Sequence, residues 1–394
     1  MAGYFKSAKK DFKIKYSINY LLVLAILAAG LIMYFTGGLK MSYARLFTQI
    51  GFSVILAVSL NLVVGYLGEL SLGHAGFMCI GAYVGGKFAL SLTQAIPNKL
   101  IVLILAMLVG GLVSAVFGFV IGLPALRLKG DYLAIVTLAF GEIVRNIFKN
   151  QKIFGGAMGL QTGAIQYDSR QRPTLYIVTL VVALVMLVLI QNFIRSKHGR
   201  AVTAVRDNEI AAKAMGINVT FYKLFVFILA AFFAGIAGVI YSHYTATVLY
   251  SFFSYNYSIE ILVMVVLGGM GSITGSIIAA VLVPIINYLL QNYVPADLAA
   301  LRYLIYALVL IFIVVFSNAP ALQPLRDKLR IPVLLKKLRK HQKHDPAKFK
   351  DDEASWDRVP TKIPMDAILT TDINPNRTNT GNPDIGDSKG GKSK

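Results

Sequence analysis

Cysteine, tryptophan and charge are all scarce in this chain of 394 residues. It has one cysteine, Cys79, so it forms no internal disulfide, and it has one tryptophan. Charged residues make up 15% of the chain, against about 25% in soluble domains. Acids are the scarcer sign, with 19 Asp and Glu against 39 Lys and Arg. These shortages, in a chain that is 56% hydrophobic, exclude a disulfide scaffold, a disordered chain and an ordinary soluble enzyme.

The chain is instead rich in apolar residues and carries a large positive charge. Its mean hydropathy is +0.64 and its formal net charge is +20. Five lysines precede the first apolar run, and sixteen bases follow from Arg326 to the C-terminus. A nucleic-acid-binding domain would spread its bases over the fold that presents them, whereas bases flanking apolar runs are typical of membrane proteins. The pattern therefore favours the lipid bilayer, and not nucleic acid, as the surroundings of the chain.

Ten apolar runs approach the length of about 20 residues that a helix needs to cross a bilayer. The clear runs are 20–35, 46–66, 100–122, 175–194, 221–241 and 301–316. The shorter or interrupted runs are 75–92, 132–147, 258–268 and 276–290. We predict an all-α polytopic membrane protein of about ten transmembrane helices, some short or interrupted. Its permease domain covers 18–316, between a basic N-terminus, 1–17, and a tail, 317–394, that is basic and then polar and disordered.

The bases also predict an orientation. If the N-terminal lysines are cytoplasmic, ten crossings place both the basic segment 195–213 and the basic start of the tail, 326–350, in the cytoplasm. The bases at 149–172 fall on the outer side and go against this bias. We expect both the N- and the C-terminus to be cytoplasmic.

Glycine-rich interruptions occur at 68–77 and at 268–275. Irregular backbone at membrane depth is tolerated only inside the protein or along a water-filled cavity, and Ser and Thr hydroxyls can satisfy the freed backbone groups. Short interrupted segments in both halves of a chain indicate a transport pathway. The candidate residues of this path are Ser71, Gly73, His74, Gly76, Gly268, Gly269, Gly271, Ser272 and Thr274. The alternatives are close helix packing by small residues, a hydrogen-bonded structural role for His74, and a structural ion pair for Glu142 and Arg145.

Two segments match the P-loop pattern in sequence but lack the context that the motif needs, and no metal or catalytic motif is found. Residues 386–393 fit the P-loop pattern, but no strand precedes them and the chain ends one residue later. Residues 81–87 repeat the spacing, with Phe88 where the metal-binding hydroxyl should stand. Five His and one Cys show no zinc spacing, and Ser, His and Asp form no recognisable triad. We expect no catalytic residue, no metal and no cofactor.

Residues 195–217 contain the features of a short docking helix. Asp207 or Asn208 can cap it, Glu209 stands in its first turn, and Gly216 suits its C-terminal cap. Ala211, Ala212 and Met215 would form a small apolar face, flanked by bases such as Arg200 and Arg206. A cytoplasmic helix with these features indicates docking to another protein, and the alternative is an ordinary interfacial linker.

Four of these segments together resemble a known family, the LivM-type permeases of branched-chain amino acid ABC importers. They are 68–83, 126–138, the docking segment and 268–275, and the resemblance covers about 45–316. Glu209, Ala211, Ala212 and Gly216 resemble the coupling helix that sits in a groove of the ATPase subunit.

The resemblance implies a multi-pass subunit of the bacterial inner membrane that binds no ATP itself. Its implied partners are a homologous second permease, cytoplasmic ATPase subunits and an extracytoplasmic substrate-binding protein. The tail from about Arg326 departs from the family pattern. Three alternatives stay open: a related permease for urea, short amides or simple sugars; a proton-coupled secondary transporter using Glu69, His74 or Glu142; and a scaffold acting through the basic tail.

Overall fold

The computed structural model describes residues 19–26, 41–128, 130–167 and 172–293, together with the isolated positions 28, 30, 308 and 311. The chain divides into two compact units, Met1–Ala319 and Pro320–Lys394, and every described residue belongs to the first. The predicted N-terminus, part of the first run, most of the last run, the tail and its P-loop-like match lie outside the described residues.

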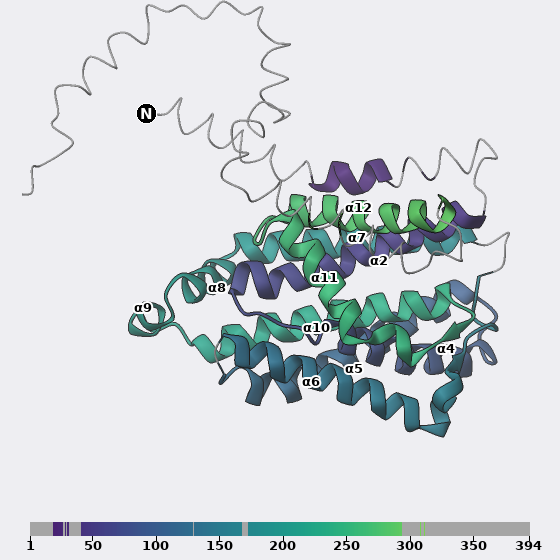
Figure 1. Ribbon diagram of the computed structural model, residues 1–394. Helices are drawn as coiled ribbons and strands as arrows, with labels where there is room; N and C mark the ends of the chain where they lie inside the picture. Colours follow the sequence, from purple (N-terminus) through teal and green to yellow (C-terminus); the bar gives the residue numbers. More distant parts are fainter. Residues whose placement is uncertain are drawn as a thin grey trace, which may run out of the picture. The chain divides into compact units, whose positions relative to one another are not determined.

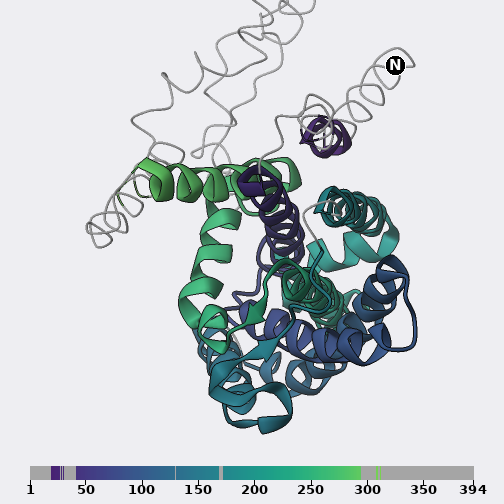
Figure 2. The same cartoon turned by 90° about the vertical axis from the view of Figure 1, so that its right-hand side faces the viewer.

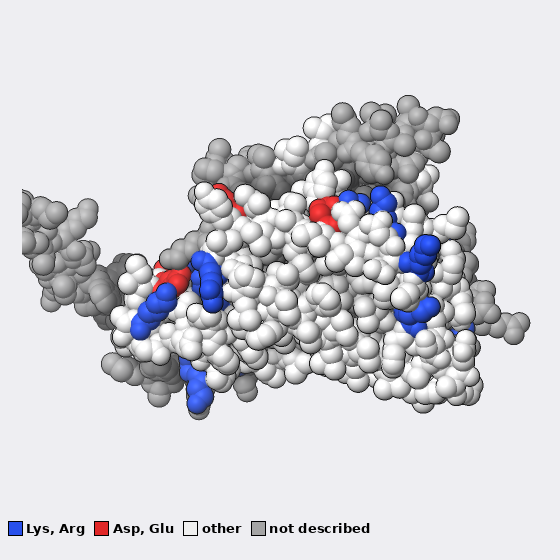
Figure 3. Space-filling view, turned by 90° about the horizontal axis from the view of Figure 1, so that it is seen from below, with Lys and Arg blue, Asp and Glu red and all other residues white. Residues whose placement is uncertain are grey.

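Six helices of the described part are long and apolar enough to cross a membrane. They are Tyr43–Leu67, His74–Thr93, Lys99–Ala125, Thr174–Arg195, Val219–Tyr244 and Ile273–Asn292. In Figure 3, charged side chains gather at two ends of the visible face and leave a wide uncharged band between them. This is the surface expected of a protein whose middle lies in lipid.

Two of these spans combine α-helical and π-helical segments. The first span joins α2 (Met41–Asn61) to a π-helical segment, η1 (Leu62–Leu67). The second is a continuous helix of α3 (His74–Ile80), η2 (Gly81–Gly85) and α4 (Gly86–Thr93). The second P-loop-like match, 81–87, therefore lies within helix and not in a phosphate-binding loop. The remaining long spans are α5 (Lys99–Ala125), α7 (Arg172–Arg195), α10 (Val219–Tyr244) and α12 (Ile273–Tyr293).

Two of the shorter predicted spans are not among the six long apolar helices. Run 132–147 lies in α6 (Asp131–Asn150), a helix that is not among the six apolar ones. Run 258–268 lies in α11 (Tyr255–Gly268), whose 14 residues extend about 21 Å, short of the roughly 30 Å hydrocarbon layer. The described residues thus establish a multi-pass helical protein, and the count of ten spans stays a prediction.

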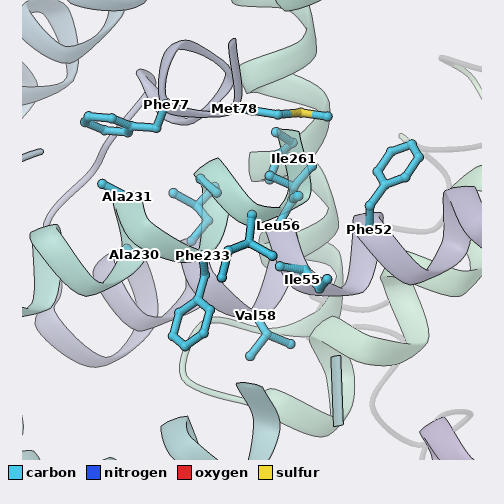
Figure 4. Close-up of a cluster of buried hydrophobic side chains, with 14 of the residues drawn as sticks. Phe52, Ile55, Leu56, Val58, Phe77, Met78, Ala230, Ala231, Phe233 and Ile261 are labelled. Atoms are coloured by element: carbon cyan, nitrogen blue, oxygen red, sulfur yellow. The ribbon is translucent and has the colours of Figure 1, made fainter. Parts of the chain in front are cut away.

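The core is centred on the span Tyr43–Leu67. In its most apolar stretch 94% of residues are buried, against 39% for Lys99–Ala125, so α2 is an inner helix and α5 presents a broad outer face. Figure 4 shows α2 side chains such as Phe52 and Leu56 in one buried cluster with Phe77 of α3, Phe233 of α10 and Ile261 of α11.

Close contacts between helices depend on glycine, which has no side chain. A Cβ on Gly81 would lie 2.1 Å from the carbonyl oxygen of Gly235, and one on Gly238 would lie 2.0 Å from that of Met78. The helices α3, η2 and α10 therefore approach to backbone contact, as small residues permit in membrane bundles.

The two ends of the bundle carry different irregular elements. At one end are two short helices, α8 (Lys197–Asp207) and α9 (Glu209–Ala214), which Figure 1 shows next to the start of α10. At the end where α10 finishes, two 3-10 turns, η3 (Lys152–Phe154) and η4 (Gly156–Met158), precede β1 (Leu160–Gln161), which pairs antiparallel with β2 (Thr247–Val248). A further 3-10 turn, η5 (Tyr250–Phe253), leads into α11. Over the residues that the structure describes, the fold is all-α apart from this small ladder.

Candidate functional site

The second glycine interruption is a sharp turn between α11 and α12, visible in Figures 1 and 2. Gly269 and Gly271 have positive φ angles of 88° and 79°, which favour glycine. Ser272 Oγ accepts a hydrogen bond from Gly275 N at 3.2 Å and so caps the start of α12. Thr274 Oγ1 donates to Asn19 Oδ1. A Cβ on Gly268 would lie 2.3 Å from the carbonyl carbon of Gly275, so the turn has no room for side chains at its base.

The first interruption is an irregular segment between η1 and α3. Thr137 Oγ1 accepts from Leu72 N at 3.0 Å, and Ser258 Oγ accepts from Ala75 N at 3.1 Å. Hydroxyls from distant helices therefore satisfy the freed backbone groups, which is the condition for irregular backbone at membrane depth. Ser71 is buried.

The candidate path residues of this segment pack tightly. A Cβ on Gly73 would lie 2.5 Å from the Thr137 carbonyl oxygen, and one on Gly76 would lie 2.8 Å from the Cα of Gly141. His74 is buried, and its Nε2 hydrogen-bonds Ser59 Oγ at 2.9 Å. These contacts hold α3 against α6 and α2.

The second interruption contacts the end of the span Tyr43–Leu67. Asn61, at the end of α2, accepts a hydrogen bond through Oδ1 from Gly271 N at 2.9 Å. A Cβ on Gly65 of η1 would lie 2.2 Å from that same nitrogen. The backbone of η1 and the turn before α12 are thus in direct contact, although they are far apart in the sequence.

The docking segment forms two helices where the sequence predicts one. Asn208 separates them and caps α9: its Oδ1 accepts from Ile210 N and Ala211 N, both at 3.0 Å. Gly216, two residues beyond α9, has a positive φ of 78°, as a helix-ending glycine should. The capping predictions for Asn208 and Gly216 are confirmed.

The two sides of α9 differ in character. Ile210 and Met215 are 80% and 82% exposed, and Ala211 is exposed beside them. Ala212 is 4% exposed and faces the protein, so it is not part of the outward apolar surface in which the sequence analysis placed it. The reason is geometric, because neighbours at i and i+1 point about 100° apart on a helix.

Arg206 connects α8 to both interruptions. Its Nη1 donates to the carbonyl oxygen of Gly65 at 3.1 Å, while Nε and Nη2 bind Asp207 at 2.9 and 2.8 Å. Its side chain also passes Gly68, where a Cβ would lie 2.6 Å from Arg206 Cγ, and its Nη1 is within van der Waals range of a Cβ on Gly271. Arg200 is exposed on α8.

A buried ion cluster makes a second connection. Lys223 Nζ, on a side chain 6% exposed, lies 2.5 Å from Glu69 Oε1 and 3.3 Å from Glu209 Oε2. Glu209 also binds the exposed Lys213 at 3.0 Å. Because a buried charge is costly without partners, this lysine ties α9, the first interruption and α10 together. Figure 1 shows α8 and α9 at this end of α10.

Sequence reasoning missed Lys223, Asn61 and Ile210. For the first two a signal exists, because each is a lone polar residue inside an apolar run. Polar residues in membrane spans are costly unless they have a polar partner or a function. Nothing in the sequence separates Ile210 from other apolar residues.

Glu142 and Arg145 form a local structural unit at a different place. Arg145 Nε donates to Glu142 Oε2 at 2.9 Å, and Glu142 Oε1 accepts from Tyr255 N at 3.0 Å, in the first turn of α11. The carboxylate therefore binds the positive end of that helix. Among the described residues, no group of three or more His, Cys, Asp or Glu is placed to hold a metal ion.

The fold and this site define a multi-pass membrane protein in which a short protruding helix is bonded to the breaks in its spans. The chain belongs to the family described as branched-chain amino acid transport system / permease component, whose model matches residues 42–314.

Individual relatives carry the same description. The chain is 36% identical over 272 residues to the high-affinity branched-chain amino acid transport system permease protein LivM of Salmonella typhimurium, covering 61% of each chain. It is 27% identical over 307 residues to the probable LivM of Methanocaldococcus jannaschii, covering 68% of this chain and 89% of that one. A solved structure, PsaBC from Streptococcus pneumoniae in complex with Fab, superposes with a TM-score of 0.39 at 15% identity, covering 75% of this chain and 99% of that chain.

Proposed function

We propose that this chain is the permease subunit of an ATP-binding cassette importer that moves branched-chain amino acids across the bacterial inner membrane. The observation that carries the proposal is the bonding of the docking segment to η1 and to the first interruption, through Arg206 to Gly65 and through Glu209 and Lys223 to Glu69. The substrate class comes from the relatives named above, of which the Salmonella LivM is matched over 61% of its length.

In this proposal the outward face of α9, with Ile210 and Met215, docks on a cytoplasmic ATPase subunit. Large exposed apolar side chains on a short protruding helix are typical of a protein contact, because isolated exposure of such area in water is unfavourable. Glu209 acts inside the chain, since its carboxylate binds Lys223 and Lys213. The ATPase supplies the chemistry, and this chain supplies differential contacts between its inward- and outward-facing states.

Motion of α9 would reach the spans through two rigid connections. One is Arg206, bonded to the π-helical segment that touches Gly271. The other is Lys223, bonded to the first interruption. π-Helical turns occur often at functional sites, and breaks in membrane helices are the points at which spans can change direction. The candidate path residues from Ser71 to Gly76 and from Gly268 to Thr274 adjoin these connections.

The complete transporter in this proposal has about ten spans in this subunit, with both termini cytoplasmic. A homologous second permease forms the other half of the path, and an extracytoplasmic binding protein delivers the substrate. The end of the bundle with β1 and β2 then faces outward, because α10 runs from the docking segment to this ladder.

The docking surface is tested by Met215→Asp, with Met158→Asp as a matched control. The two methionines are 82% and 83% exposed, but Met158 lies in η4, on the side of the ladder. A buried charge in an apolar contact is costly, so we expect Met215→Asp to lower co-purification of the ATPase subunits and substrate-stimulated ATP hydrolysis at least tenfold. Met158→Asp should leave ATPase co-purification unchanged.

The measurements are made on the complex reconstituted in liposomes, with uptake of labelled leucine, isoleucine and valine as the transport readout. Stimulated hydrolysis that survives Met215→Asp in a stably assembled complex would show that α9 is not the docking helix. Uptake of other solutes but not of these three would place the chain with a different substrate class.

A further inference from the structure

Three large apolar side chains are exposed at the end of the bundle that carries β1 and β2. Ile153 of η3 is 68% exposed, Met158 of η4 is 83% exposed, and Leu249, directly after β2, is 44% exposed. A Cβ on Gly159 would lie 3.1 Å from Leu249 Cδ2, and one on Gly155 would lie 2.0 Å from the Gly159 carbonyl oxygen, so these segments pack against each other. We call the three side chains and the segments that carry them the ladder surface.

The ladder surface has a fixed backbone and lies outside the hydrocarbon layer. Gly156 N donates to the Gln151 carbonyl oxygen at 3.1 Å, and Thr162 N donates to the Ala246 carbonyl oxygen at 2.8 Å. The surface consists of 3-10 turns and a two-residue ladder beyond the ends of α6 and α10, and exposed irregular backbone of this kind does not occur against lipid tails. Large apolar side chains grouped on a fixed surface in water are typical of a contact with another protein.

The charge of the ladder surface is positive. From 146 to 167 and from 244 to 258 the chain has two bases, Lys149 and Lys152, and no acid. Lys149 Nζ lies 5.4 Å from the ring centroid of Tyr250, the residue after Leu249, and Lys152 is exposed in η3 itself. Among the described residues, the ion pairs include neither lysine. Both bases go against the orientation bias, so the bias does not explain them, whereas acidic groups on a partner would.

We propose that the ladder surface docks the soluble substrate-binding protein. Ile153, Met158 and Leu249 form the apolar centre of the contact, and carboxylates of the binding protein lie opposite Lys149 and Lys152 at its rim. An apolar centre with a charged rim is the usual composition of a protein–protein contact. A fixed surface also loses little conformational entropy on binding. The inference rests on the proposed function, which places this end on the outer side of the membrane and supplies a soluble partner there.

The ladder surface is tested by binding of leucine-loaded binding protein, purified from the same organism, to the assembled transporter in nanodiscs. Met158→Asp puts a charge in the apolar centre, so we expect it to weaken binding by about tenfold or more. Lys152→Glu reverses a rim charge and should slow association about fivefold at low salt and less at high salt. Lys197→Glu changes an exposed base of α8 at the opposite end and is the matched control. Its binding should stay within about twofold of the unmodified complex.

A photo-crosslinking residue identifies the occupant directly. Benzoylphenylalanine in place of Met158 should form an adduct with the binding protein, and the same residue in place of Met215 should not. Adducts at 158 with lipid alone or with a second copy of this chain would overturn the inference. So would unchanged binding by both Met158→Asp and Lys152→Glu in an assembled complex that takes up leucine. An unmodified complex that neither binds such a protein nor takes up leucine would overturn the proposed function as well.

Discussion

The two ends of α10 are bonded to their neighbours in different ways. At its start, Lys223 pairs with Glu69 and Glu209, and Arg206 binds the Gly65 carbonyl nearby. About 27 Å further along the helix, Tyr241 stacks on Phe252 with ring centroids 4.4 Å apart.

The same contrast holds beyond α10 itself. On the side of the ladder, Tyr83 stacks on Phe148 at 4.6 Å and donates a hydrogen bond to the Val248 carbonyl oxygen at 3.0 Å. The charged end is a small number of strong, directional contacts between elements that are interrupted or protruding. The aromatic end is a broad packed surface. The first arrangement can transmit a displacement between elements, whereas the second holds them in place.

The largest expected effect comes from Lys223→Met. This substitution leaves the nearly buried carboxylate of Glu69 without its cation. Removing one partner of a buried ion pair costs about 3–5 kcal/mol of stability. The unfolding midpoint can be followed by thiol labelling of Cys79, the single and buried cysteine of the chain. We also expect substrate-stimulated ATP hydrolysis in the complex to fall at least tenfold.

A triple variant separates stability from coupling. Lys223→Met/Glu69→Gln/Glu209→Gln removes all three charges, so most of the lost stability should return while coupling stays low. A matched single control is Lys213→Met, which removes the exposed partner of the same Glu209. It should change ATP hydrolysis by less than twofold and the free energy of unfolding by about 0.5 kcal/mol. If the triple variant regained coupling, the charged end would be structural only.

The next effect in size is expected from Gly65→Ala. The new Cβ would lie 2.0 Å from Asn61 Oδ1 and 2.2 Å from Gly271 N, so η1 and the turn before α12 must separate. Overpacking of this kind costs about 1–3 kcal/mol. Gly163→Ala, near the ladder, is the control, because a Cβ there meets nothing within 4 Å.

Cys79 labelling and uptake are measured for both glycine variants. We expect Gly65→Ala to lower the unfolding midpoint and the uptake rate, and Gly163→Ala to change neither. Normal uptake by a correctly assembled Gly65→Ala complex would mean that the contact between η1 and the turn before α12 does not matter for transport.

The smallest effect is expected at the aromatic end, from Tyr83→Phe. The ring and its stack on Phe148 remain, and only the hydrogen bond to the Val248 carbonyl is lost, at a cost of about 0.5–1.5 kcal/mol. Uptake at saturating substrate should stay within twofold of the unmodified chain. A large loss of transport at unchanged stability would contradict the assignment of this end to packing.

Local features of the candidate site could be predicted because their causes are local. Asn208 caps α9 and Gly216 ends it through contacts within a few residues. The glycine-rich segments that break the spans can be recognised directly in the sequence. The partners of those features could not be predicted. Glu69 and Lys223 are separated by 154 positions, and a sequence pattern gives no distance between them.

The spans show the same division. Apolar length predicts a helix at 132–147 and at 258–268, and helices are found there, in α6 and α11. The length of 258–268 already marks it as short, but length does not reveal that the apolar stretch of Tyr43–Leu67 is buried while α5 faces outward.

The scarcity of charge and the placement of the bases by themselves determined that this is a membrane protein with a basic segment at 195–213, because transfer of charge into lipid is costly wherever the chain folds. Which charges lie together was decided only by the tertiary structure. Packing through glycine brings η1 into backbone contact with the turn before α12 and leaves room at Gly68 for the Arg206 side chain, which reaches the Gly65 carbonyl oxygen, while Lys223 reaches Glu69.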